Sequence, residues 1–257
     1  MPPHLLDPRL LSLIAASILG GAVNALAGGG TFLVFPALVL ASVAPITANA
    51  TASFILWPAG LASAWVYRKD IPNDRRLLTL MSIVSAIGAI AGSFVLLRTS
   101  NATFSGLVPW LLLFATLNFT FAKQLRSLAA RASHGASFAL LIVGQLVISF
   151  YGGYFGAGMG VLMLALYLSA TGKDVHVANG LRLVCGVVIN AVAIVIFTVR
   201  GAIDWHLGFP MMLSALLGGY FGAVLVRRLD PESARRWVKI YAWAVTLWFF
   251  GKQLLAR

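Results

Sequence analysis

The chain has 257 residues, of which 60% are hydrophobic and only 10% are charged, and its formal net charge is +12. Soluble globular domains carry about 25% charged residues, so this composition excludes a water-soluble core at this length. We predict a single membrane domain of packed helices over residues 1–257. The positive charge does not indicate nucleic-acid binding, because the basic residues lie in short loops between apolar segments. The only cysteine, Cys185, excludes an intramolecular disulfide and a cysteine metal cluster.

Ten apolar segments follow one another, five in each half of the chain. In the first half they are 10–27, 31–43, 46–67, 77–97 and 104–121, and in the second half 136–157, 161–170, 175–199, 207–226 and 238–255. The second segment of each half reaches only roughly 20 Å or 15 Å as a helix. Neither crosses a hydrocarbon core of about 30 Å. We therefore expect each half to form a hairpin broken at its glycines, followed by three transmembrane helices.

The two halves repeat one another at an offset of 130 residues. The Ala-Gly-Gly-Gly motif that ends at Gly30 returns as Ala-Gly-Met-Gly ending at Gly160, and Asn49 returns as Asn179. The same register pairs Gly88 with Gly218, Gly92 with Gly222, and Arg98 with Arg228. We place repeat one at residues 10–122, a basic linker at 123–135 and repeat two at 136–255. Paired, glycine-interrupted repeats indicate a transporter whose site lies between them.

Loop charges predict how the two repeats are oriented. Loop 68–76 carries four basic residues and loop 98–103 carries one. In the second half the bias reverses, with one basic residue in loop 200–206 and five in loop 227–239. By the positive-inside rule the rich loops are cytoplasmic, so equivalent loops lie on opposite sides. We expect inverted repeats with both termini outside. Parallel repeats, the alternative, would place one rich loop outside.

The glycine motifs are candidates for a ligand site. Three consecutive glycines, Gly28, Gly29 and Gly30, precede Thr31, which is suited to cap a helix. A helix that begins there points its positive end toward the midplane, which favours an anion. A second break, from Gly158 to Gly160, supplies another helix end. Close helix packing is the alternative for membrane glycines, and we expect it to explain four others, Gly88, Gly92, Gly218 and Gly222.

Polar side chains near the breaks extend the candidate site. Asn49 and Asn179 occupy equivalent positions early in the third segment of each half, and Thr51, Asn24 and Asn190 can line the same cavity. Asparagine offers two donors to a ligand, although helix capping and interhelical bonding are equally good explanations. Five tryptophans fit interfacial aromatic belts instead: Trp57, Trp65, Trp205, Trp237 and Trp243.

Arg182 is the one basic residue well inside an apolar segment. Such a residue is costly unless it pairs, faces water or snorkels to the interface. All seven acidic residues are terminal or in loops, so the missing counter-ion can be an anionic substrate. Snorkelling is the alternative. The absence of intramembrane acids also argues against proton coupling. An interior negative by about 100 mV favours efflux of a monovalent anion by roughly 2.3 kcal/mol, without any coupling ion.

Two motifs carry a family resemblance. Residues 21–36 read GAVNALAGGGTFLVFP, an Ala-rich stretch with Asn49 follows, and the pattern recurs as GGYFGAGMGVLML before Asn179. Over residues 11–250 the chain resembles the sulfite exporter TauE/SafE family of bacterial membrane permeases. It departs from its own pattern where Pro36 has Leu166 as counterpart, which leaves the bend of the second hairpin open. The resemblance implies an inner-membrane protein that moves small sulfur-containing anions such as sulfite, thiosulfate or sulfonates.

Together these observations predict an all-helical, inverted-repeat permease that exports a small sulfite-like oxoanion or sulfonate by alternating access. The predicted substrate-binding residues are Gly28, Gly29, Gly30, Thr31, Asn49, Thr51, Gly158, Gly160, Asn179 and Arg182. We expect no catalytic residue, cofactor or metal, and the expected partners are the anion and the lipid bilayer. One alternative is a membrane-embedded enzyme acting on a lipid-linked substrate, which would need an intramembrane acid, a metal cluster or a nucleophile–base pair. Another is a structural subunit of a membrane complex.

Overall fold

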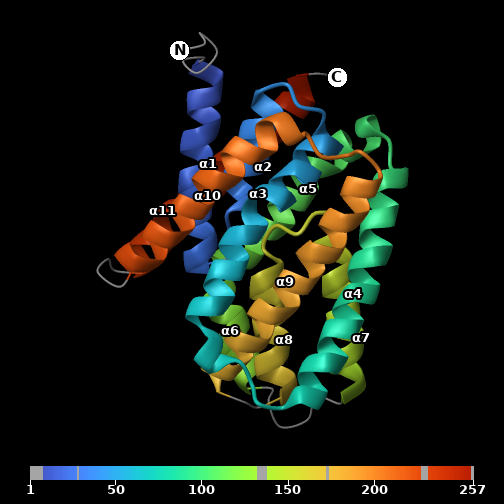
Figure 1. Cartoon of the computed structure of the whole chain (residues 1–257), viewed down its shortest axis with the longest axis vertical. Helices are drawn as coiled ribbons and strands as arrows, with labels where there is room; N and C mark the ends of the chain where they lie inside the picture. The colour runs from blue at the N-terminus through green and yellow to red at the C-terminus, as the bar shows by residue number, and fades with distance from the viewer. Residues whose placement is uncertain (1–7, 28, 132–137, 172–173, 227–230, 256–257) are drawn as a thin grey trace.

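The computed structural model describes residues 8–27, 29–131, 138–171, 174–226 and 231–255, and this part of the chain contains helices and no strand (Figure 1). The helices are α1 (Pro8–Ala27), α2 (Thr31–Leu40), α3 (Pro45–Val66), the 3-10 turn η2 (Arg68–Asp70), α4 (Arg75–Arg98), α5 (Asn101–Thr120), α6 (Ala122–Arg131), α7 (Phe138–Tyr154), α8 (Met159–Thr171), α9 (Val175–Val199), α10 (Trp205–Val226) and α11 (Pro231–Leu255). The all-helical prediction is confirmed.

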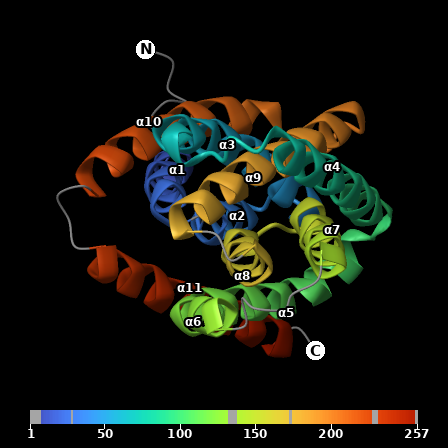
Figure 2. The ribbon, with the colours of Figure 1, turned by 90° about the horizontal axis from the view of Figure 1, so that it is seen from below.

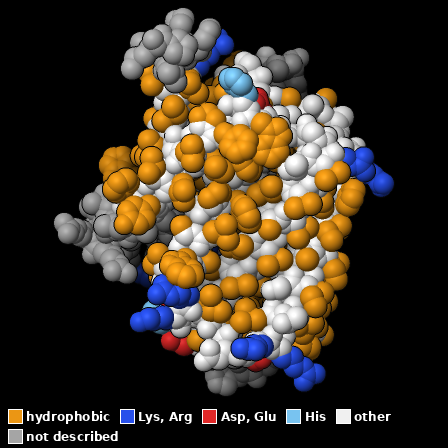
Figure 3. All heavy atoms as spheres, viewed as in Figure 1, with side chains coloured by type: hydrophobic (Ala, Val, Ile, Leu, Met, Phe, Trp, Pro, Cys, Tyr) orange, Lys and Arg blue, Asp and Glu red, His pale blue; other side chains and the backbone are white. Residues whose placement is uncertain are grey.

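Several of these helices suit a membrane. Within the described residues, α4, α5 and α9 are long and apolar enough to cross a bilayer, and α1, α2, α7 and α8 contain shorter apolar stretches. Hydrophobic side chains are spread over the face in view in Figure 3, where lipid can cover them. Val195 and Phe221, for example, are each 62% exposed. The chain is a multi-pass membrane protein.

Each half opens with a helical hairpin that turns at glycines. In the first half, Gly20 of α1 lies against Val34 of α2 across the break. In the second, Gly144 lies against Leu166, so α8 folds back along α7. Lipid cannot satisfy the backbone groups freed at such turns, so they must be enclosed by protein. Figure 2 shows α2 and α8 in the interior beside α9, with α4, α5, α10 and α11 toward the outside.

The second turn uses the conformational freedom of glycine. Gly156 and Gly158 have φ values of +80° and +74°, in the left-handed region that other residues rarely adopt. The N–H groups of Phe155 and Gly156 both donate to the carbonyl of Tyr151, which closes the end of α7.

The two most extensive helix contacts cross between the halves. The hairpin helix α1 packs along α10, and the hairpin helix α7 packs along α4. A Cβ on Gly88 would lie 2.6 Å from the Leu146 carbonyl oxygen, and one on Gly222 would lie 2.6 Å from Ala22 Cα. Glycine therefore lets these backbones touch, as predicted for Gly88, Gly92, Gly218 and Gly222.

Two antiparallel pairs of helices join the halves, one in the interior and one at the edge of the molecule in Figure 2. In the α3–α9 pair, Trp57 Nε1 donates to the Val187 carbonyl at 3.2 Å. In the α5–α11 pair, the Thr116 and Thr246 hydroxyls are 2.9 Å apart. The Gln253 amide, further along α11, donates to the Gly106 carbonyl at 3.4 Å, so these helices run in opposite directions. The Trp57–Val187 and Thr116–Thr246 contacts each join residues that are 130 positions apart.

The ends of the molecule differ in charge. Both chain termini lie at the upper end in Figure 1, and the connection between α3 and α4 lies at the lower end. Lys and Arg side chains gather at that lower end in Figure 3. The helices extend into the predicted loops: Arg75 and Arg76 open α4, and Arg236 and Lys239 lie in α11. Most of the basic linker, predicted at 123–135, is the helix α6.

The glycine contacts between α4 and α7 predict a specific sensitivity to added volume. A Cβ on Gly92 would overlap the carbonyl oxygen of Phe150, whereas one on Gly251 would meet nothing within 4 Å. We expect Gly92→Ala to destabilise the fold by about 1–3 kcal/mol through overpacking. Gly251→Ala should be neutral or slightly stabilising, because alanine favours helix by about 1 kcal/mol. Melting temperatures of the detergent-purified variants test this, and equal values for both would contradict the packing described.

Candidate functional site

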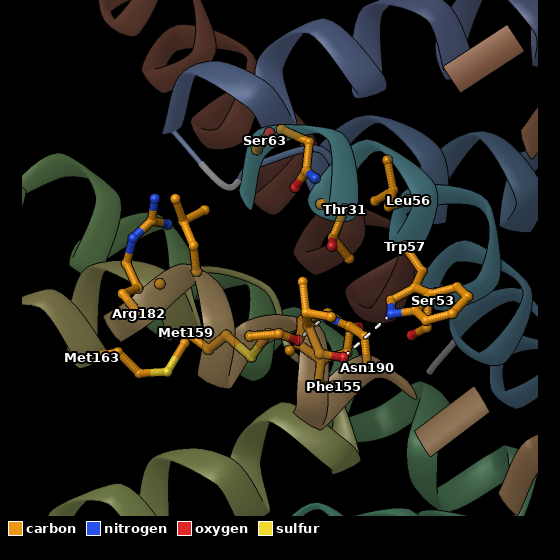
Figure 4. Close-up of a pocket in the computed structure, with 17 residues that line it drawn as sticks. Thr31, Ser53, Leu56, Trp57, Ser63, Phe155, Met159, Met163, Arg182 and Asn190 are labelled. Atoms are coloured by element: carbon orange, nitrogen blue, oxygen red, sulfur yellow. Dashed lines mark hydrogen bonds between the residues drawn. The ribbon is translucent and has the colours of Figure 1, made fainter. Parts of the chain in front are cut away.

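A cavity of about 90 Å³ lies where the two hairpins meet α3 and α9. Since one water molecule occupies about 30 Å³ in the liquid, the cavity holds a small molecule of a few atoms. Figure 4 shows Arg182 and Met163 on one side, Trp57 and Asn190 on the other, and Thr31 between them. The remaining lining residues are Asn24, Ser53, Leu56, Gly60, Ser63, Phe155, Gly156, Met159, Gly160, Leu183, Gly186 and Val187.

Residues of both halves that are related by the 130-residue offset line this cavity. Four pairs from α3 and α9, each separated by 130 residues, contribute to the lining: Ser53 and Leu183, Leu56 and Gly186, Trp57 and Val187, and Gly60 and Asn190. The chemistry of the two halves differs, however. Arg182 has Ala52 as its counterpart, and Thr31 has Val161. The two halves therefore contribute different chemistry to one cavity.

Arg182 is fixed by a single amide. Its Nε and Nη2 donate to Asn179 Oδ1 at 3.1 and 2.8 Å, which orients the plane of the guanidinium. A Cβ on Gly160 would lie 2.7 Å from Nη1, so the absence of a side chain there makes room for the guanidinium beside α8. Within the described part of the chain no carboxylate pairs with Arg182. Asn179 orients the cation without neutralising its charge.

The starts of two helices also face the cavity. Thr31 is the first residue of α2, and Gly160 lies in the first turn of α8. Helix N-termini carry a partial positive charge. The N–H groups of Phe32, Met159 and Val161 already donate to carbonyls of the preceding turns, so these two ends act mainly through that charge. Thr31 is not the N-cap that the sequence suggested: Gly30 holds that position, already in helical conformation, and no side chain caps the helix. The Thr31 hydroxyl thus remains available to the cavity.

The other polar lining groups differ in how much hydrogen-bonding capacity they retain. Asn190 Nδ2 donates to the Gly186 carbonyl at 2.9 Å, and the hydroxyls of Ser53 and Ser63 donate to carbonyls one turn earlier. Asn24 makes no side-chain hydrogen bond to another described residue. The described lining includes no Asp or Glu. The cavity thus combines one positive charge with several uncharged donors.

Other predicted residues lie beside the cavity rather than in its lining. Asn49 Nδ2 donates to the Tyr154 carbonyl at 3.1 Å, and Thr51 Oγ1 accepts from the Asp204 N–H at 3.0 Å. Gly158 faces Ala115, and Gly29 packs near Phe119. Their contacts hold the hairpins and the α9–α10 connection in place. Of the predicted residues, the lining includes Thr31, Gly160 and Arg182, together with Asn24 and Asn190, whereas Gly28 lies outside the described residues.

The position of Trp57 differs from the predicted one. Trp57 lines the cavity and bonds to α9, instead of lying in an interfacial aromatic belt. The depth of a tryptophan in the membrane depends on where its helix begins and ends. The sequence indicates that boundary only to within a few residues, so it did not separate a central tryptophan from an interfacial one. The offset of 130 residues could have identified it, because it pairs Trp57 with Val187 in the middle of equivalent helices.

A buried polar cluster lies behind the cavity and was not predicted from the sequence. Gln145 Nε2 donates to the hydroxyls of Ser85 and Ser149 at 2.7 and 3.0 Å. The Tyr167 hydroxyl donates to Gln145 Oε1 at 2.7 Å, and the Met163 sulfur lies 3.7 Å from Nε2. A satisfied network of this kind fixes α8 against α4 and α7. Its members are far apart in sequence and follow no motif, so only the packing reveals them.

Comparison with known proteins places the chain among transporters. A probable membrane transporter protein of Haemophilus influenzae is 27% identical over 241 residues, covering 92% of each chain. The probable membrane transporter protein YfcA of Escherichia coli strain K12 is 27% identical over 228 residues, or 86% of this chain and 82% of that protein. No solved structure matches the chain. These relatives are named as transporters rather than enzymes, and the family model for the sulfite exporter TauE/SafE matches residues 13–249: the chain belongs to that family.

Proposed function

We propose that this membrane permease carries a small anion through the cavity at Arg182. The observation that carries the proposal is a guanidinium that faces the cavity and has no carboxylate partner among the described residues. An arginine at the centre of a span costs about 2.5–3.5 kcal/mol by insertion-based scales. Arg182 lies about 10 Å from the start of α9, so it bears part of that cost. A bound anion offsets this cost and neutralises the charge.

The surrounding donors suit an oxoanion. Arg182 Nη1, the Thr31 hydroxyl and the Asn24 amide belong to three different elements that line one cavity. The starts of α2 and α8 add partial positive charge, which favours anions. An anion with several oxygens can accept from all of these groups at once. The size of the cavity and the family description support sulfite or a small sulfonate as the substrate type.

We propose further that the two halves are inverted repeats. A contact between equivalent residues can occur only near a two-fold axis, and both Trp57–Val187 and Thr116–Thr246 are such contacts. Because both pairs join antiparallel helices, that axis runs across the helices, in the plane of the membrane. The swapped packing of α1 on α10 and α7 on α4 supports the same relation. The site then lies at the interface of the repeats, where many transporters bind their substrates.

Orientation and direction follow from charge. The end with the α3–α4 connection carries most of the visible Lys and Arg, so we propose that it is cytoplasmic in a bacterial inner membrane, with both termini outside. The inside-negative membrane potential then favours export of a monovalent anion. Alternating exposure of the cavity to the two sides completes the proposed cycle.

The central role of Arg182 can be tested by binding. Removing one partner of a buried charge pair costs about 2 kcal/mol or more, so Arg182→Ala should weaken sulfite binding roughly 30-fold or more. Arg182→Lys should recover only part of the affinity, because a single ammonium cannot keep the paired bonds to Asn179 and also reach the anion in the same geometry. Isothermal titration of purified protein with a series of oxoanions and sulfonates gives the affinities.

A matched control separates this effect from general loss of positive charge. Arg98 is an exposed arginine at the end of α4, away from the cavity lining, and Arg98→Ala should leave binding unchanged. Equal affinities of Arg182→Ala and the unmodified protein for every anion in the series would remove Arg182 from the site.

The driving force can be tested in proteoliposomes. We expect an imposed membrane potential to drive sulfite flux and a pH gradient alone to have little effect, because no intramembrane carboxylate was found by which a proton could be coupled. Labelled sulfite with a potassium–valinomycin potential, or with a pH jump at zero potential, measures both. Flux that follows the pH gradient and ignores the potential would overturn this mechanism.

A further inference from the structure

A second hollow lies on the outer surface, at the end that carries the basic α3–α4 connection. It is a groove of about 850 Å³ along the first turns of α4 and the start of α7. Its lining residues are Asp74, Arg75, Arg76, Leu77, Thr79, Leu80, Ile83 and Phe138. The groove shares no residue with the central cavity, so it has no part in the proposed anion path.

One part of this groove is an exposed apolar wall. Ile83 is 52% exposed and Phe138 is 60% exposed. From Arg76 to Ile83 the helix rises about 10 Å, so the wall begins at the charged end and runs toward the hydrocarbon region. Side chains of this kind, on the outer surface of a membrane protein, are covered by lipid tails.

The other part of the groove carries a pair of cations. Arg75 and Arg76 are both exposed, and neither forms an ion pair with a described residue. The neighbouring carboxylate is already engaged, because Asp74 Oδ1 accepts from the Leu77 N–H at 3.0 Å and caps α4. The groove thus places two available guanidinium groups next to an apolar wall, at the end of the wall that is nearer the membrane surface.

The second half of the chain provides an internal comparison. At the equivalent position Asp204 Oδ1 accepts from the Leu207 N–H at 3.1 Å, so α10 begins with the same cap as α4. The two residues after that cap are Trp205 and His206 instead of two arginines. Because the same local fold forms without them, Arg75 and Arg76 are not required to start the helix.

We propose that this groove binds an anionic phospholipid, with its phosphate on Arg75 and Arg76 and an acyl chain along Ile83 and Phe138. The two chemistries of the groove match the two parts of such a lipid, and a headgroup lies at the depth where a transmembrane helix begins. Basic residues near a membrane surface attract anionic lipids. Trp205 and His206, the equivalent residues at the opposite end, suit a membrane interface without a preference for anionic lipid.

Lipid binding to the full-length protein in detergent tests the proposal. Purified protein is titrated with phosphatidylglycerol, or with phosphatidylcholine of the same acyl chains, and bound lipid is counted by native mass spectrometry. We expect at least about tenfold preference for phosphatidylglycerol, and its loss in Arg75→Gln/Arg76→Gln. A matched variant, Lys69→Gln/Lys123→Gln, removes two exposed charges outside the groove and should keep the preference.

Three outcomes would overturn the proposal. The first is equal binding of both lipids to the unmodified protein. The second is an equal loss in the two double variants, which would assign the preference to net charge alone. The third is displacement of phosphatidylglycerol by millimolar glycerol phosphate, which would show that the apolar wall contributes nothing. Ile83→Asn keeps both arginines and shortens the apolar wall. We expect this variant to bind phosphatidylglycerol more weakly, and glycerol phosphate to remain unable to displace the bound lipid.

Discussion

A break in a membrane helix frees backbone N–H and C=O groups that lipid cannot satisfy. The chain contains two such breaks, before Thr31 and around Gly156 and Gly158, and much of the fold encloses them. The short helices α2 and α8 lie in the interior beside α9, and longer helices lie between them and the outside (Figure 2). Enclosing both breaks in one place also brings two helix starts to one cavity. The need to shield freed backbone groups from lipid therefore accounts for the enclosed hairpins, the helices around them and the candidate site.

The halves hold each other's hairpins. The contacts of α1 with α10 and of α7 with α4 are made by glycines, which allow backbone to touch backbone. The antiparallel contacts at Trp57–Val187 and Thr116–Thr246 then join the halves through equivalent residues. The cavity lies between these halves and is lined by helices of both. Its chemistry can still be asymmetric, because Arg182 has only an alanine as its counterpart.

The features that sequence could predict are those that repeat or that violate a strong rule. The hairpin breaks repeat, and Arg182 is a charge where lipid forbids one, so both were visible. Side-chain direction was not: Asn49 and Thr51 sit near the site but bond to Tyr154 and Asp204. Trp57 was misassigned because its depth depends on where the span begins. The network around Gln145 depends on three helices meeting, which no local pattern encodes.

The central claim is that an anion sits between Arg182 and the broken helices. Anomalous diffraction from crystals grown with selenite, whose selenium marks an oxoanion of the sulfite type, tests it most directly. We expect a selenium peak inside the cavity, within hydrogen-bonding reach of Arg182 Nη1 and the Thr31 hydroxyl. Selenium peaks confined to the basic loops, with the guanidinium of Arg182 bound only to Asn179, would contradict it.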